Sequence, residues 1–161
     1  MRELSLAYAA AADARDGEGL AALFVEDGAL VVPRYPVDLR PVVTRSGSHA
    51  LGQVAAMLGR YDRTFHVVAD ARFEVEGDLA SGEVQCVAHH VTASAGAAQG
   101  PGPEGAVPTP PADPSGTDMV WFIRYRDRYR RTASGWRFVR RELHLQWVEE
   151  HPVSMLAGPP E

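Results

Sequence analysis

The first sixty residues place apolar side chains at the three- and four-residue spacing of helices in three separate stretches. The first stretch predicts an amphipathic helix over about residues 2–15, with the stripe Leu4, Ala7, Tyr8, Ala11 and Ala14. A second, short helix is expected after Asp16, whose carboxylate suits an N-cap. A third is expected after Ser46 or Ser48, either of which could cap it.

The pattern between the second and third helices is less regular. Residues 26–28, Glu-Asp-Gly, predict a turn, and residues 29–33 predict a strand. Three prolines at positions 33, 36 and 41 indicate an irregular loop over residues 34–41.

After Arg60 the apolar period changes from helical to alternating. Strands are predicted over about residues 64–75, 80–93, 119–131 and 136–148, the first two joined by a turn at Glu76-Gly77-Asp78. Helices followed by a long antiparallel meander indicate an α+β fold. We expect one domain over residues 1–150 and a flexible tail over residues 151–161.

One segment interrupts the meander. Eleven of the 25 residues in 93–117 are Gly or Pro, so this segment lacks the apolar pattern that packs a core. It is expected to be a long hairpin loop. It could be a passive insertion, or a lid over a pocket.

Composition narrows the functional classes. The chain has 161 residues, is 45% hydrophobic and carries a net charge of −5, which favours a globular protein over a nucleic-acid binder. No apolar run approaches a membrane span, and the N-terminus lacks a signal-peptide layout, so a cytoplasmic protein is expected. All 16 cationic residues are Arg, which excludes Schiff-base lysine chemistry. A single Cys86 excludes a multi-cysteine zinc site.

Three residues could carry proton-transfer chemistry: Tyr8, Asp13 and His66. Tyr8 and Asp13 lie about 140° apart around the predicted helix, so both could border a pocket beneath it. His66 lies within a predicted strand and is either a hydrogen-bonded structural residue or a general base. An Asp bound to its other ring nitrogen would fix the tautomer that a base needs.

His89 and His90 are adjacent in a predicted strand, so their side chains point to opposite faces and cannot easily bind one metal ion. No metal site is therefore expected. His90 shares a face with Cys86 and Ala88, whose small side chains would leave room for a ligand. Cys86 is most simply a small core residue.

Residues 124–141 hold eight Arg and one acid, Asp127. The alternating Arg residues share one strand face, and Tyr125, Asp127 and Tyr129 share the other. The Arg face could be solvated, could pair with acids at an oligomer interface, or could bind nucleic acid. No stacking motif supports nucleic acid.

The order of these features resembles the SnoaL-like branch of the NTF2-like superfamily. The resemblance rests on residues 8–29, 64–90 and 124–147, and it is closest in motif to scytalone dehydratase and bile-acid 7α-dehydratase. It implies an NTF2-like cone, in which a curved, mostly antiparallel sheet packs against N-terminal helices around an apolar pocket. The long Pro/Gly-rich segment departs from both enzymes.

The resemblance also implies roles for individual residues. Tyr8 and Asp13 match the helix-one pair, and His66 matches the dyad histidine. His90 falls at the position of a second pocket histidine, with His89 as the alternative. Contacts with substrate are expected from His89, Phe24, Cys86 and Tyr125.

The activity implied is acid–base lyase (dehydratase) or isomerase chemistry on a cyclic, steroid- or polyketide-like molecule. It needs no cofactor, and relatives of this branch form homodimers or homotrimers. Two alternatives remain: a non-catalytic ligand-binding or association module in the same cone, and a SnoaL-type polyketide cyclase.

Overall fold

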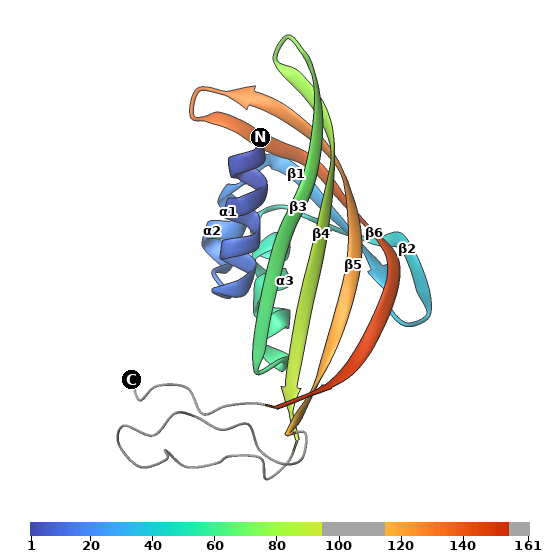
Figure 1. Cartoon of the computed structure of the whole chain (residues 1–161). Coiled ribbons are helices and arrows are strands. Elements are labelled where there is room, and N and C mark those ends of the chain that lie inside the picture. Colours follow the sequence, from blue (N-terminus) through green and yellow to red (C-terminus); the bar gives the residue numbers. More distant parts are fainter. Residues whose placement is uncertain (95–114, 155–161) are drawn as a thin grey trace, which may run out of the picture.

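The computed structural model describes residues 1–94 and 115–154 as three α-helices, a 3₁₀ turn and a six-stranded sheet. The helices are α1 (Arg2–Asp13), α2 (Gly17–Ala22) and α3 (Ser48–Met57), followed by η1 (Leu58–Arg60). They lie together on the concave side of the curved sheet (Figure 1). This arrangement is the α+β cone that the sequence predicted.

Side-chain N-caps were predicted for α2 and α3, and only the cap of α2 is observed. The Asp16 side chain accepts a hydrogen bond from the Gly19 amide at 2.8 Å, which caps α2 as predicted. Helix α3 instead begins after Gly47, with no side-chain cap, so the expected capping role of Ser46 or Ser48 was wrong. Gly47 has φ of 79°, a conformation that suits glycine and turns the chain into the helix.

The sheet has the strand order β2-β1-β6-β5-β4-β3. Its strands are β1 (Phe24–Arg34), β2 (Asp38–Ser46), β3 (Arg63–Glu76), β4 (Leu79–Ala93), β5 (Gly116–Thr132) and β6 (Gly135–Val153). Strand β1 runs parallel to β6, and every other neighbouring pair is antiparallel. The four strands after residue 60 were predicted with bounds within three residues of those observed, except that β6 continues to Val153. It thus runs five residues past its predicted end and includes the first three residues of the predicted tail.

The region between α2 and α3 departs from the prediction. Residues 26–28 are not a turn: they belong to β1, where the pairing with β6 shifts register between Phe24 and Ala29. Half of the expected loop over residues 34–41 is the start of β2, Arg34 is the end of β1, and residues 35–37 form the turn between them. In β2, Pro41 pairs with Pro33 at an irregularity, and β2 is an edge strand, the position where a sheet tolerates proline.

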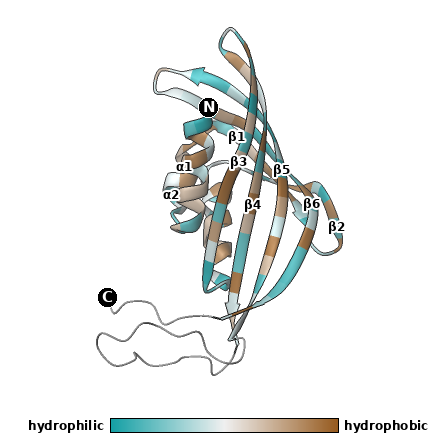
Figure 2. Cartoon of the chain, in the orientation of Figure 1, coloured by the Kyte–Doolittle hydropathy of each residue, from teal (hydrophilic) through white to brown (hydrophobic). Residues whose placement is uncertain are grey.

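Hydrophobic and hydrophilic residues alternate along the long strands (Figure 2), and buried positions alternate with more exposed ones. On β5, Tyr125, Asp127 and Tyr129 are buried, whereas the intervening Arg126 and Arg128 are exposed. The buried face packs against the apolar stripe of α1, which includes Leu4, Tyr8 and Ala12. The alternating strand pattern predicted from the sequence is confirmed.

Strands β4 and β5 stay paired up to Ala93 and Gly116, and the Ser94 amide donates to the Ser115 carbonyl at 2.8 Å. Most of the predicted Pro/Gly-rich loop (95–114) and of the predicted tail (155–161) lies outside the described residues. Among the helices described, none is long and apolar enough to cross a membrane.

Candidate active site

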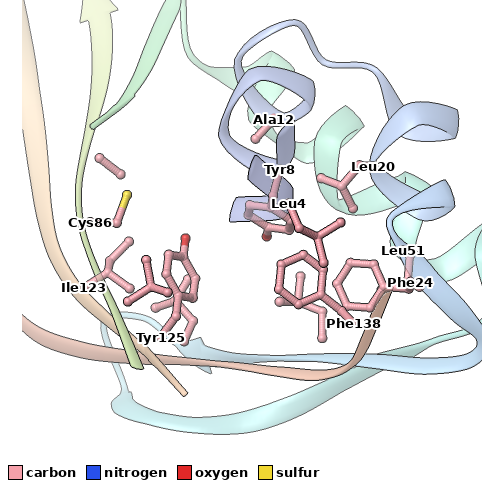
Figure 3. Close-up of a cluster of buried hydrophobic side chains, with 14 of the residues drawn as sticks. Leu4, Tyr8, Ala12, Leu20, Phe24, Leu51, Cys86, Ile123, Tyr125 and Phe138 are labelled. Carbon is pink, nitrogen blue, oxygen red and sulfur yellow. The ribbon is translucent and has the colours of Figure 1, made fainter. Parts of the chain in front are cut away.

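A pocket of about 460 Å³ lies between the helices and the concave face of the sheet. Four of the expected site residues line it: Tyr8, His66, His90 and Tyr125. Most of the other lining residues are apolar, among them Ala12, Leu20, Val54, Leu58, Trp121, Ile123 and Leu143. Figure 3 shows Tyr8 and Ala12 on the helix side, opposite Ile123 and Tyr125 on the sheet side.

Asp13 and His66 form a two-point contact. The ring Nδ1 of His66 lies 2.6 Å from Asp13 Oδ1, and the His66 backbone amide donates to Asp13 Oδ2 at 2.8 Å. Asp13 is the last residue of α1, and His66 lies near the start of β3. The side chain of His66 is only 7% exposed, so the end of the helix and the strand hold the imidazole in one position.

The charge of Asp13 fits this contact. Partial burial raises the pKa of Asp13, but the side-chain and backbone hydrogen bonds from His66 outweigh burial and lower the pKa overall. An ionised carboxylate only accepts hydrogen bonds, so Nδ1 of His66 carries the proton and Nε2 of the neutral ring carries the lone pair. His66 therefore brings a fixed basic nitrogen to a residue that lines the pocket.

His90 is the second histidine of the pocket. Its Nδ1 donates to the Met119 carbonyl at 3.1 Å, which leaves Nε2 as an acceptor. Its ring packs edge-on against His66 at 5.9 Å between centroids. Burial lowers the pKa of His90 to about 4, so this ring is neutral at pH 7.

Two phenols supply hydrogen-bond donors. Burial raises the pKa of Tyr8 to about 12 and that of Tyr125 well above its usual value, so both stay protonated at neutral pH. Within the described ranges, neither hydroxyl has a hydrogen-bond partner in the protein. Both residues line the pocket, so their hydroxyl groups can donate to an oxygen atom of a bound ligand.

A buried ion pair packs against the rings of Tyr8 and Tyr125. Arg141 donates from Nε and Nη2 to both carboxylate oxygens of Asp127, at 2.9 and 2.8 Å. The two residues face one another across β5 and β6, and their side chains are 1% and 0% exposed. The guanidinium lies over the rings of Tyr8 and Tyr125, 4.5 and 4.0 Å from their centroids, which fixes both rings.

Three expected substrate contacts lie outside the pocket lining. His89 points to the opposite face of the sheet, where its Nδ1 lies 2.6 Å from Asp118 Oδ2. Phe24 packs in the core against Phe138, with ring centroids 5.1 Å apart. Cys86 is buried in the same core, where burial raises the pKa of its thiol to about 12.

Other lining residues were not anticipated from the sequence. They include Arg34 and Arg45 from the strands of the first hairpin, and Arg60 from η1. The expectation of a loop at residues 34–41 concealed Arg34, and no strand was predicted at Arg45. Arg141 was signalled only indirectly: Arg140 and Arg141 are adjacent in a strand, so one had to point inward, where Asp127 required a cation.

The site combines a fixed base, a neutral acceptor and two donors around a largely apolar space. Such a set can remove a proton from a carbon next to a carbonyl group and stabilise the oxyanion that forms. Among the described residues, no group of three or more His, Cys, Asp or Glu is arranged to hold a metal ion.

Solved structures share this fold. A protein of unknown function from Mycobacterium tuberculosis, Rv3472, is 26% identical, with a TM-score of 0.65, covering 90% of this chain and 69% of that one. A candidate scytalone dehydratase from Novosphingobium aromaticivorans is 20% identical, with a TM-score of 0.65, covering 99% and 89%. The type 2 hexachlorocyclohexane dehydrochlorinase LinA is 16% identical, with a TM-score of 0.69, covering 98% and 90%.

No functionally curated protein is significantly similar in sequence. The family comparison gives a direct result, because the SnoaL-like domain matches residues 1–142, nearly the whole of the described region. This match agrees with the resemblance that the helix and strand motifs indicated. The chain therefore belongs to the SnoaL-like domain family.

Proposed function

We propose that this protein is a cofactor-independent lyase that removes water from a cyclic hydroxyketone, with His66 as the base. The observation that carries the proposal is the Asp13–His66 contact at 2.6 Å beside a mostly apolar pocket. A module that only holds a ligand does not need a histidine whose tautomer is fixed by a carboxylate.

The reaction would proceed as a β-elimination. Nε2 of His66 takes the proton from the carbon next to the carbonyl, and Asp13 stabilises the resulting imidazolium. Tyr8 and Tyr125 donate to the enolate oxygen. The C–O bond of the β-hydroxyl group then breaks as the C=C bond forms, and the proton held by His66 leaves with the hydroxide as water.

An isomerase would use the same residues. In that case the proton taken by His66 returns to a different carbon of the enolate, and no bond to oxygen breaks. The mass of the product distinguishes the two reactions, since dehydration removes one water molecule and isomerisation leaves the mass unchanged.

The test begins with a screen of hydroxylated cyclic ketones for loss of water by mass spectrometry. The active compound is then assayed with the His66→Ala variant and with a control, His144→Ala. His144 also contacts a carboxylate, that of Glu142 at 3.1 Å, but it does not line the pocket. We expect His66→Ala to abolish turnover and His144→Ala to retain it. A near-normal rate for His66→Ala refutes the mechanism, and a co-purified ligand with no turnover favours a binding module.

A further inference from the structure

The charged residues that line the pocket all have the same sign. They are Arg34 at the end of β1, Arg45 in β2 and Arg60 in η1, which the fold brings together from three separate elements. Among the described residues, no Asp or Glu lines the pocket, since Asp13 lies behind His66 and both of its oxygens accept hydrogen bonds from that residue. The pocket is therefore locally cationic, although the chain as a whole carries a net charge of −5.

Among the described residues, none of these arginines has a carboxylate within ion-pair distance, although Asp38 lies near enough to Arg34 for the two charges to interact. In the part of the chain that the structure describes, neither Arg34 nor Arg45 forms an ion pair. Asp38, the residue of β2 that pairs with Arg34 in the strand register, is bound instead by Arg40, which donates to its two oxygens at 3.0 and 2.8 Å. Arg60 donates to the hydroxyl of Tyr61, at 2.9 Å, and its guanidinium can still bind a second acceptor.

The two ends of the pocket differ in how exposed their lining residues are. Tyr8, Tyr125 and His90 are at most 5% exposed, so they form its floor. Arg34 and Arg60 are exposed and Arg45 is half-buried, which places the three arginines toward solvent, at the mouth. A ligand that spans the pocket would thus meet guanidinium groups at one end and the proton-transfer groups at the other.

Three like charges around one opening repel one another, and an anion bound between them removes that cost. The planar guanidinium group pairs with carboxylate or phosphate oxygens through two parallel hydrogen bonds. Because the net charge of the protein repels anions at long range, their recognition requires a local cationic site such as this one.

We infer that the substrate is an anion, a cyclic compound whose carboxylate or phosphate group is bound at the mouth by Arg34 and Arg45, with Arg60 beside them. The inference rests on the proposed function for the reaction at the other end of the molecule. It adds a substrate class, since neutral steroid- or polyketide-like compounds would leave the arginines unused.

The experiment measures binding of three probes of similar ring size by calorimetry: 2-naphthoate, 2-naphthyl phosphate and the neutral 2-naphthamide. We expect at least one anion to bind the wild-type protein about tenfold more tightly than the amide, the effect of one charge-assisted hydrogen bond. The anion that is preferred identifies the group that the site takes. Equal affinities for all three probes, or no binding of either anion, overturn the inference.

Variants assign the preference to the mouth. Arg34→Met with Arg45→Met should bring the ratio of anion affinity to amide affinity close to one. Arg126→Met with Arg128→Met removes the same two charges from the outer face of the sheet and should keep the preference. Circular dichroism checks the fold of each variant, and the exposed Arg60→Met gives a second, independent test. A preference that survives in both the double variant of Arg34 and Arg45 and Arg60→Met contradicts the assignment.

Failure of this inference is distinguishable from failure of the proposed reaction, because probe binding requires no turnover. An anion preference that depends on the arginines, with no His66-dependent dehydration, supports the anion site and refutes the reaction. His66-dependent dehydration without an anion preference supports the reaction and refutes the anion site.

Discussion

The buried pair of Arg141 and Asp127 gives the most quantitative prediction for stability. Asp127→Asn keeps the shape of the side chain but leaves the guanidinium of Arg141, 1% exposed, without a counter-charge. Breaking a buried ion pair on one side costs about 3–5 kcal/mol. The two hydrogen bonds at 2.9 and 2.8 Å give a similar figure, at about 1.5–3 kcal/mol for each charged contact.

The assay is urea unfolding monitored by tryptophan fluorescence. The dependence of the unfolding free energy on urea concentration is compared between variants to confirm two-state behaviour. Glu83→Gln is the control, because Glu83 contacts Arg124 and Arg126 at 3.6 and 3.9 Å on the solvated face. Loss of such exposed pairs costs about 0–1 kcal/mol. Replacing both buried partners, Asp127→Leu with Arg141→Met, should be less harmful than Asp127→Asn alone. A cost below about 1 kcal/mol for Asp127→Asn would refute the reasoning.

Three further predictions follow from the site and the sheet. Folding lowers the pKa of His90 to about 4, whereas an unperturbed histidine has a pKa of about 6.5. Between these two pH values the unfolded chain binds more protons than the folded one, so lowering the pH from about 6.5 to about 4 should reduce the free energy of unfolding by at most about 3 kcal/mol. The free energy of unfolding, measured by urea at several pH values in this range, should depend less on pH for His90→Gln than for the wild-type protein. Tyr8→Phe should lower turnover by about tenfold to a hundredfold without loss of fold, since it removes one donor and keeps the base; an unchanged rate would exclude Tyr8 from the reaction. The Arg-rich face should not retain duplex DNA at about 0.15 M salt in a gel-shift assay, because Glu83, Asp78 and Glu142 already contact its arginines.

The Asp13–His66 pair could be anticipated because its members lie in elements with clear periodicity. The helix ends near Asp13 and the strand begins near His66, so the resemblance to SnoaL-like proteins could be transferred residue by residue. The pairing itself could not be read from the sequence, since it depends on how α1 crosses β3. Strand alternation placed His90 with Cys86 and Ala88, and the structure assigns the pocket side to His90 rather than His89.

The first hairpin could not be predicted for a physical reason. Proline removes a backbone donor and usually breaks a strand, so Pro36 and Pro41 indicated a loop. Here Pro41 lies in an edge strand, where its missing N–H is tolerated. The wrong prediction of a loop also affected the predicted site, because this hairpin contributes Arg34 and Arg45 to the pocket.

The central claim is that Asp13 and His66 act together as one base. The most direct measurement is the dehydration rate of an active hydroxyketone with Asp13→Asn, His66→Ala and the double variant. Residues that act as a unit lose most of the rate at the first substitution. We therefore expect each single variant to lose nearly all activity and the double variant to be little worse than the worse single one. Independent, multiplying losses from the two substitutions, or a near-normal rate for Asp13→Asn, would contradict the account.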